Sequence, residues 1–239
     1  MSNMISRIKP SLIICPILTA CMLFIMIGCN SSGNTASVDS GTLSKTVLNL
    51  PEAYYLEVTV TASSGFGSQE TTYVLSRSDG WIYLKLGYDR EQYVYKRISD
   101  GKYIEYKYSP EKGKYLPTMI SEALQAQIDA GNVPIDSVAT GQESVDAKIQ
   151  TLDPYICSYR TLASSLSYSG EETVNGTVCK KYTGTVNAVL TKSELEFWID
   201  PSTGLAFRYI NKTRTGLMTT QEKTEITEYS EEPRIPSVS

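Results

Sequence analysis

Apolar and polar residues alternate with a period of two through most of the chain between Tyr54 and Tyr108. Successive side chains of a strand point to opposite faces of a sheet, so this alternation predicts β-strands. Residues that favour turns interrupt the alternation at positions 63–68, 78–80, 89–90 and 99–101. We therefore expect about five antiparallel strands, joined by short hairpins, in this part of the chain.

The middle of the chain changes to apolar spacings of three and four, which are typical of a helix. These spacings predict a helix over residues 119–130, which Thr118 caps and Gly131 ends. Two further helices are predicted, over residues 143–150 and 153–164.

Period-two alternation returns from Thr173 to Tyr229. Asn175-Gly176 is a strong signal for a two-residue hairpin turn. The last strand, over residues 217–229, has polar residues at alternate positions, so we expect it at an edge of the sheet or facing water. Strands, then helices, then strands predict one α+β domain with a curved antiparallel sheet and two to three helices against one face.

The first 28 residues differ from the rest of the chain. Two basic residues precede an apolar run at positions 12–27, and the first acidic residue is Asp39. This is the layout of a secretory signal peptide. A small residue precedes Cys29 in the sequence Met-Ile-Gly-Cys, as in a lipobox, whose cysteine receives a diacylglycerol and acyl chains such as palmitate. We expect a lipoprotein signal peptide over residues 1–28 and an extracytoplasmic chain anchored to the cell membrane through Cys29.

Two other interpretations of this segment stay open. Cys21 follows Leu-Thr-Ala, which fits a lipobox better by residue type, but cleavage there leaves an apolar stub at residues 22–27. An uncleaved transmembrane helix over residues 11–28 is long enough to span a bilayer core, although Pro16 argues against it. All three interpretations place the bulk of the chain outside the cytoplasm.

The remaining chain divides into three parts. Residues 29–47 are rich in Ser, Thr, Gly and Asn and are predicted to be a flexible tether. Residues 48–232 form the single expected binding domain. Residues 233–239, which include Pro236, are predicted to be a frayed tail.

Charge and composition exclude several classes of function. Without the two basic residues of the signal peptide, 20 of the 22 Lys and Arg residues remain against 26 Asp and Glu. This acidic balance disfavours nucleic acid as a partner. The chain has no histidine, which removes Ser-His-Asp catalysis and histidine metal sites. We find no phosphate loop and no cysteine cluster, so we expect no catalytic residue, no metal, no cofactor and no enzyme activity.

Cys157 and Cys179 remain after the signal peptide and the anchor are set aside. An even pair in an oxidising compartment indicates a disulfide. The alternative is two buried free thiols.

Tyrosine is in excess, with 17 residues against four phenylalanines. Many tyrosines fall in the first group of strands. A tyrosine ring is apolar with a polar tip, so one interpretation is a binding face lined by rings. The other is rings that stack across neighbouring strands of a partly covered sheet.

The sequence Trp-Ile-Asp-Pro-Ser-Thr-Gly-Leu at residues 198–205 resembles a strand–turn–strand motif of the LolA/LolB-like superfamily of lipoprotein and lipid-binding proteins. Residues 170–182, which end at Tyr182, resemble that family's preceding strand pair. The resemblance implies an unclosed half-barrel whose concave face is covered by helices over an apolar cavity that holds acyl chains. Soluble carriers of the family lack lipidation, so an anchored chain argues against a shuttling role.

We therefore expect a membrane-anchored lipoprotein that binds a hydrophobic ligand, such as a lipid or an acylated protein, in a half-barrel cavity. A second hypothesis is a cell-envelope interaction or sensor module with a closed core and a tyrosine-rich binding face. In the first hypothesis the cavity is lined by the inward strand residues Leu56, Val58, Ile82, Leu84, Leu86, Leu195, Phe197, Leu205 and Phe207.

Overall fold

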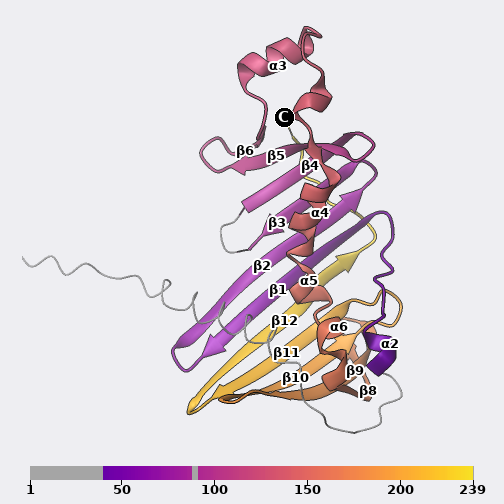
Figure 1. Cartoon of the computed structure of the whole chain (residues 1–239), viewed down its shortest axis with the longest axis vertical. Coiled ribbons are helices and arrows are strands. Elements are labelled where there is room, and N and C mark those ends of the chain that lie inside the picture. The colour runs from indigo at the N-terminus through magenta and orange to yellow at the C-terminus, as the bar shows by residue number, and fades with distance from the viewer. Residues whose placement is uncertain (1–39, 88–90, 239) are drawn as a thin grey trace, which may run out of the picture. The chain divides into compact units, whose positions relative to one another are not determined.

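The computed structural model describes residues 40–87 and 91–238 (Figure 1). Residues 37–239 form one compact unit that contains all of the strands and the helices α2 to α6, so we expect this unit to fold without the residues before it. The predicted signal peptide, Cys29 and most of the predicted tether lie outside the described residues. No helix within the described ranges is long and apolar enough to span a bilayer.

The strands are β1 (Tyr54–Ser64), β2 (Gly67–Ser78), β3 (Trp81–Leu86), β4 (Glu91–Ser99), β5 (Lys102–Ser109), β6 (Lys114–Pro117), β7 (Thr140–Gly141), β8 (Leu166–Val174), β9 (Thr177–Asn187), β10 (Thr191–Ile199), β11 (Ala206–Thr215) and β12 (Met218–Ser230). The helices are α2 (Ser40–Leu43), α3 (Glu122–Asp129), α4 (Gln142–Gln150), α5 (Asp153–Ile156) and α6 (Tyr159–Leu162), with two 3₁₀ turns, η1 (Ile135–Val138) and η2 (Ala163–Ser165).

All strands belong to one antiparallel sheet in the order β6-β5-β4-β3-β2-β1-β12-β11-β10-β9-β8, and the short β7 pairs with β5. Two meanders, β1 to β6 and β8 to β12, meet where β1 pairs with β12. The sheet ends at β6 on one side and at β8 on the other, so it is unclosed. The predicted α+β class and unclosed antiparallel sheet are confirmed, as are the five strands expected between Tyr54 and Tyr108.

The prediction for the last strand is wrong in one respect. β12 lies in the middle of the sheet, between β1 and β11, and not at an edge. Its Thr224 is completely buried. A threonine can be buried in a central strand because the backbone polar groups on both sides are satisfied by the ladders.

The predicted helices form with different boundaries. α3 starts at Glu122, and its N-cap is Ser121, whose hydroxyl accepts a hydrogen bond from the Leu124 N–H. Thr118 does not cap it because its N–H donates to the Glu105 carbonyl, which keeps Thr118 beside β5. The predicted helix over residues 153–164 is divided into α5, α6 and η2, with a break at Cys157, whose φ is −148°. The strands β6, β7 and the first part of β8 were not predicted.

α4, α5 and α6 cross one face of the sheet (Figure 1). The ring of Tyr155 in α5 stacks on Tyr73 of β2, with ring centroids 4.6 Å apart. The ring of Tyr159 in α6 meets Phe197 of β10 edge-on at 6.2 Å. We call the face that carries Tyr73 and Phe197 the helix-side face, and the other the opposite face.

Candidate functional site

The helix-side face carries the predicted lining residues. Strand alternation and register place Leu84, Leu75 and Leu56 side by side across β3, β2 and β1. Further along the sheet, the ring of Phe197 stacks on Tyr209 of β11 at 4.4 Å. Of the nine predicted residues, Leu86 is half-buried and the others are buried. The structure thus gathers the predicted set into a broad apolar layer, and whether this layer lines a ligand site stays a prediction.

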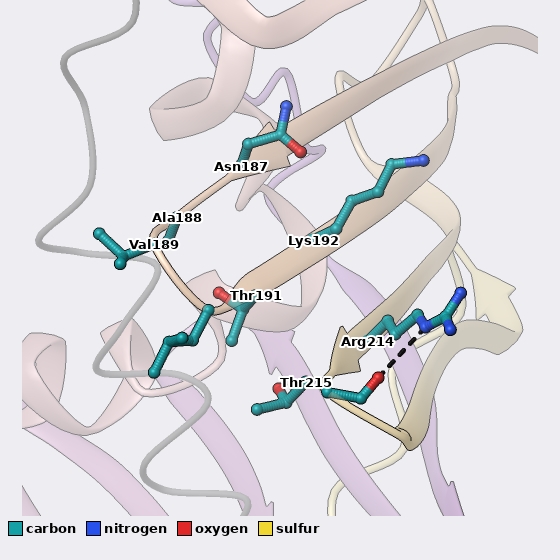
Figure 2. Close-up of a pocket in the computed structure, with 9 residues that line it drawn as sticks. Asn187, Ala188, Val189, Thr191, Lys192, Arg214 and Thr215 are labelled. Atoms are coloured by element: carbon teal, nitrogen blue, oxygen red, sulfur yellow. Dashed lines mark hydrogen bonds between the residues drawn. The ribbon is translucent and has the colours of Figure 1, made fainter.

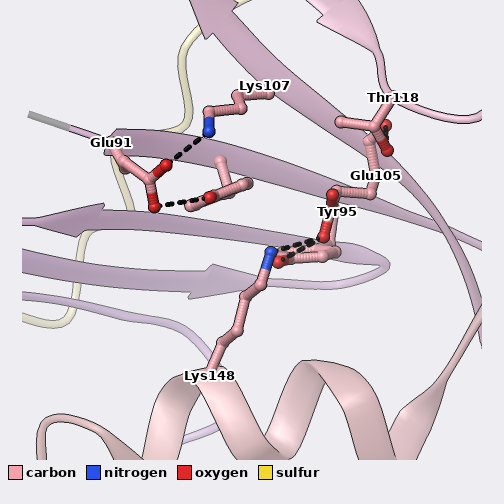
Figure 3. A network of polar contacts seen from close by, with 7 residues as sticks. Glu91, Tyr95, Glu105, Lys107, Thr118 and Lys148 are labelled. Atoms are coloured by element: carbon pink, nitrogen blue, oxygen red, sulfur yellow. Dashed lines mark hydrogen bonds and ion pairs between the residues drawn. The ribbon is translucent and has the colours of Figure 1, made fainter. Parts of the chain in front are cut away.

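At one end of this face, α4 docks through a charged network (Figure 3). The Lys148 ammonium lies 2.8 Å from Glu105 Oε2 and 3.6 Å from the centroid of the Tyr93 ring. The Tyr95 hydroxyl donates to the same Glu105 oxygen at 2.8 Å. Burial acts to raise the pKa of Glu105, but Lys148 and Tyr95 together hold it below the ordinary value. The same group of residues includes an ion pair between Lys107 and Glu91.

In the middle of the sheet, toward the hairpin ends of β1, β11 and β12, the side chains of the helix-side face become polar. Glu222 of β12 lies between Ala62 of β1 and Asn211 of β11 in the register. Burial raises the pKa of Glu222, which favours the neutral acid. Two residues along β12, on the same face, the Thr224 hydroxyl is buried and has no hydrogen-bond partner within the described part of the chain. Thr224 is in the same register row as Tyr209 and Phe197. Glu222 lies one pair nearer the β11–β12 turn, beyond the row that the ring of Tyr159 contacts.

Two hollows lie on the described part of the chain, away from the predicted lining residues. A small pocket of about 160 Å³ lies between the α2 segment and the sheet and is lined by Leu43, Lys180, Tyr182, Ile199 and their neighbours. A shallow, open hollow of about 610 Å³ lies between the β9–β10 and β11–β12 hairpins, and Lys192 and Arg214 line it (Figure 2). None of the nine predicted lining residues borders either hollow.

Cys157 and Cys179 are buried free thiols in the structure, and not the predicted disulfide. Cys179 and Lys181 are two residues apart in β9, so their side chains lie on the same face of the sheet. This is the opposite face, because the Lys181 ammonium lies over Trp198 there, 4.6 Å from the ring centroid. Cys157 joins α5 to α6, which pack on the helix-side face. The sheet therefore separates the two sulfur atoms. Burial raises the pKa of Cys157 to about 11 and that of Cys179 to about 12.

The tyrosines divide between the two faces. Tyr93 and Tyr95 lie on the helix-side face beneath Lys148. On the opposite face the hydroxyls of Tyr83 and Tyr115 both donate to Gln92 Oε1, at 3.1 and 2.8 Å. This arrangement agrees with rings that pack across strands, which was one of the two interpretations of the tyrosine excess.

Sequence reasoning did not identify the Lys148–Glu105 contact or the polar end at Glu222. Alternation along β12 places Glu222 on the same face as Thr224, and this could have marked a carboxyl group on a buried face. Among residues 40–87 and 91–238, no group of three His, Cys, Asp or Glu side chains is placed to hold a metal ion.

Comparisons with known proteins give structural similarity only. No protein-family model matches the sequence. No curated protein matches it either. Solved structures with a similar fold include LprF from Mycobacterium bovis, which is 10% identical with a TM-score of 0.36 over 83% of this chain and 92% of that one. The MucA/MucB complex of Pseudomonas aeruginosa is 17% identical with a TM-score of 0.39 over 81% of this chain and 57% of that one.

The LolA superfamily protein NE2245 from Nitrosomonas europaea is also among the similar structures, with 8% identity and a TM-score of 0.26 over 85% of this chain and 96% of that one. Proteins of the superfamily that residues 170–205 resemble are therefore found among the structural neighbours. At these identities and TM-scores, neither a family nor a function of this chain follows from the similarity.

Proposed function

We propose that the chain is an extracytoplasmic lipoprotein, anchored to the membrane through Cys29, that binds a hydrophobic ligand such as a lipid or an acylated protein on the helix-side face. The observation that carries the proposal is the length of the strands of this apolar face compared with the width of its helical cover. The helices α4 to α6 follow one another across the strands (Figure 1), and a helix is only about 10 Å wide. The central strands β1, β2 and β12 have 11, 12 and 13 residues and extend about 36 to 43 Å along the same face.

The polar end of the face supports an amphiphilic ligand. A buried hydroxyl without a partner, such as that of Thr224 among the described residues, is costly unless another group satisfies it. The neighbouring Glu222 carboxyl, whose pKa is raised by burial, can donate a hydrogen bond when it is protonated. A ligand with its apolar part along Val60 and Phe197 and a polar group at Thr224 would use both features.

The proposed anchor and the proposed ligand site belong to one arrangement. A lipidated cysteine with two or three acyl chains stays in the membrane, whereas one chain holds only marginally. The sheet would then bend around the ligand as a half-barrel, with α4 to α6 as its cover. The proposal assigns binding to this chain, with no catalysis and no cofactor.

A second candidate function is a cell-envelope interaction or sensor module with a closed core. One observation favours it: most of the predicted lining residues are buried, and neither described hollow includes them. In this case the broad apolar layer is core, and a protein partner binds elsewhere.

Native mass spectrometry of the mature protein, purified from membranes in mild detergent, tests the ligand. We expect a bound lipid-sized mass that is lost from an Ala62→Phe variant, because Ala62 is buried on the helix-side face beside Glu222. Thr61→Phe is the matched control, since Thr61 is the next residue and faces the other way. A protein that carries no ligand and takes up no added fatty acid or phospholipid would contradict the proposal.

Metabolic labelling with radioactive palmitate tests the anchor separately. We expect label in the wild type and none in a Cys29→Ser variant. Equal labelling of the two proteins would exclude Cys29 as the anchor, and label that is lost only from a Cys21→Ser variant would move the anchor to Cys21.

A further inference from the structure

Three β-hairpins turn at the same end of the sheet. The register pairs Ser64 with Thr220, which brings the turn between β1 and β2 next to the turn between β11 and β12. It also pairs Thr191 with Thr215, which places the turn between β9 and β10 on the other side of the β11–β12 turn. We call the three turns, at residues 65–66, 188–190 and 216–217, together with Met218, the tip row. It spans six neighbouring strands, or roughly 24 Å.

Each turn of the tip row carries a large apolar side chain in solvent. Phe66 is 82% exposed, Val189 99% and Leu217 99%, and Leu190 and Met218 are also exposed. Residues that favour tight turns are Gly, Asn, Asp, Ser and Pro, so turn geometry does not explain these side chains. Exposed apolar groups that gather in one place mark an interaction surface.

The nearest charges on two of the three hairpins of the tip row are basic, although the chain as a whole is acidic and the nearest charge on the β1–β2 hairpin is Glu70. Residues 63–69, 185–191 and 215–221 contain no charged side chain. The nearest charges on the β9–β10 and β11–β12 hairpins are Lys192 and Arg214, which line the 610 Å³ hollow between the two turns (Figure 2). Lys192 is also paired with Glu194 at 2.8 Å, and both partners are more than half exposed. Arg214 uses its Nε to donate to the Gly216 carbonyl at 3.3 Å, which fixes the guanidinium beside the turn. Apolar tips with basic groups behind them match the order of acyl chains and phosphates in a bilayer surface.

The chain that precedes the described residues is long enough for this contact. Leu43 of α2 lines the small pocket together with Ile199, so the described chain begins near the Ile199 end of β10. The tip row lies at the Thr191 end of the same strand, nine residues and about 30 Å away. The 11 residues from Cys29 to Ser40 extend up to about 38 Å. An anchored Cys29 therefore lets the tip row reach the bilayer that holds the anchor.

We propose that the tip row docks the domain on a phospholipid bilayer, with Phe66, Val189 and Leu217 entering the boundary between headgroups and acyl chains. The hollow between Lys192 and Arg214 receives the phosphate of an anionic headgroup. This docking is independent of the ligand proposed for the helix-side face; only the reach of the tether rests on the proposed anchor. Docking of this kind would place the hairpin end of the helix-side face at the membrane surface.

Binding of the 37–239 unit to vesicles of phosphatidylethanolamine and phosphatidylglycerol tests the proposal without the lipid anchor. We expect a Phe66→Ser/Val189→Ser/Leu217→Ser variant to lose vesicle affinity by about tenfold or more, because each removed side chain is one that would enter the bilayer. An Arg214→Gln variant should lose affinity for anionic vesicles and keep the residual binding to purely zwitterionic ones.

The matched control removes exposed apolar side chains elsewhere. Met119→Ser/Ile135→Ser changes two exposed residues near α3 and η1 and should bind vesicles as the wild type does. The fluorescence that a Leu217→Trp substitution adds should be quenched by brominated lipid, whereas the fluorescence that an Ile135→Trp substitution adds should not. Circular dichroism and urea unfolding of every variant verify that the fold is kept.

Three outcomes overturn the proposal. These are equal vesicle binding by the wild type and the tip variant, no binding by a folded wild type, and a tip-dependent dimer in sedimentation without vesicle binding, which would assign the tip row to a second copy of the chain. Ligand retention in native mass spectrometry should be unchanged in the tip variant. A failure of docking is thereby distinguishable from a failure of the ligand proposal.

Discussion

Replacing Lys148 by Met should weaken the packing of α4 against the sheet. The substitution removes the ammonium that lies 2.8 Å from Glu105 and 3.6 Å from the Tyr93 ring centroid, and leaves Glu105 with 13% side-chain exposure and no cation at that distance. A hydrogen bond to a charged group contributes about 1.5–3 kcal/mol, and a cation–π contact about 0.5–1 kcal/mol at a partly exposed site. Lys148 itself keeps 30% exposure, so we expect a loss of about 2 kcal/mol in the free energy of unfolding.

Urea unfolding of the 37–239 unit, followed by circular dichroism, measures this loss as a lower midpoint with an unchanged slope. Lys107→Met is the matched control. The ion pair of Lys107 with Glu91 retains side-chain exposures of 44% and 34%, so that variant should lose only about 0.5 kcal/mol.

The loss should also depend on pH. The pKa of Glu105 in the folded state lies below the ordinary value of 4.5, so its contribution is complete above that pH and is lost as the pH falls through the folded pKa. In the Lys148→Met variant, burial of Glu105 is no longer opposed by the lysine, so the difference between the proteins should shrink from about pH 7 to about pH 4. Equal losses for the two lysine variants, or a Lys148 effect that persists unchanged in acid, would refute the reasoning.

Three further outcomes are expected. Gly184→Ala should lower the free energy of unfolding by about 2 kcal/mol or more in urea titration, because a Cβ atom there would lie 2.0 Å from the Ser165 carbonyl oxygen; an unchanged midpoint would contradict this close approach. Burial acts to raise the pKa of Asp200, but hydrogen bonds from the residues of its turn hold it below its ordinary value of 3.8. Asp200→Ala should therefore cost about 2 kcal/mol at neutral pH and less as the pH falls through the folded pKa, as a pH series of urea titrations measures. Cys157 and Cys179, with pKa values raised to about 11 and about 12, should react with a thiol reagent at mildly alkaline pH only after unfolding, and a reductant should leave the unfolding midpoint unchanged; rapid labelling of either thiol in the folded unit would be the opposite result.

Local features of the sequence predicted much of the sheet. Alternation identified β1 to β5, β10 and β11 because one face of each strand is buried. The Asn175-Gly176 turn forms with φ values of 49° and 84°, the left-handed pair that a two-residue hairpin needs. These predictions succeed because period and turn chemistry act within a few residues.

The site features depend on contacts that a local pattern does not contain. Lys148 and Glu105 are 43 residues apart, and nothing in the helical spacing around Lys148 indicates that it lies over a tyrosine pair of β4. The expected disulfide failed for the same reason. A separation of 22 residues between Cys157 and Cys179 is compatible with a closed loop, but the chain passes from the helix layer to the opposite face of the sheet between them.

The tip row shows how a non-local pairing can create a surface. Phe66 and Leu217 are 151 positions apart, and each in isolation is one apolar residue in a hairpin turn. They become neighbours because β12 pairs with β1, which joins the two meanders into one sheet. Had β12 been an edge strand, as its polar alternation suggested, the β1–β2 turn would stand apart from the other two. The central position of β12 is therefore the structural condition for a row of three apolar tips, and a variant that disrupts the β1–β12 pairing should abolish vesicle docking together with the fold, whereas serine substitutions in the turns should abolish docking alone.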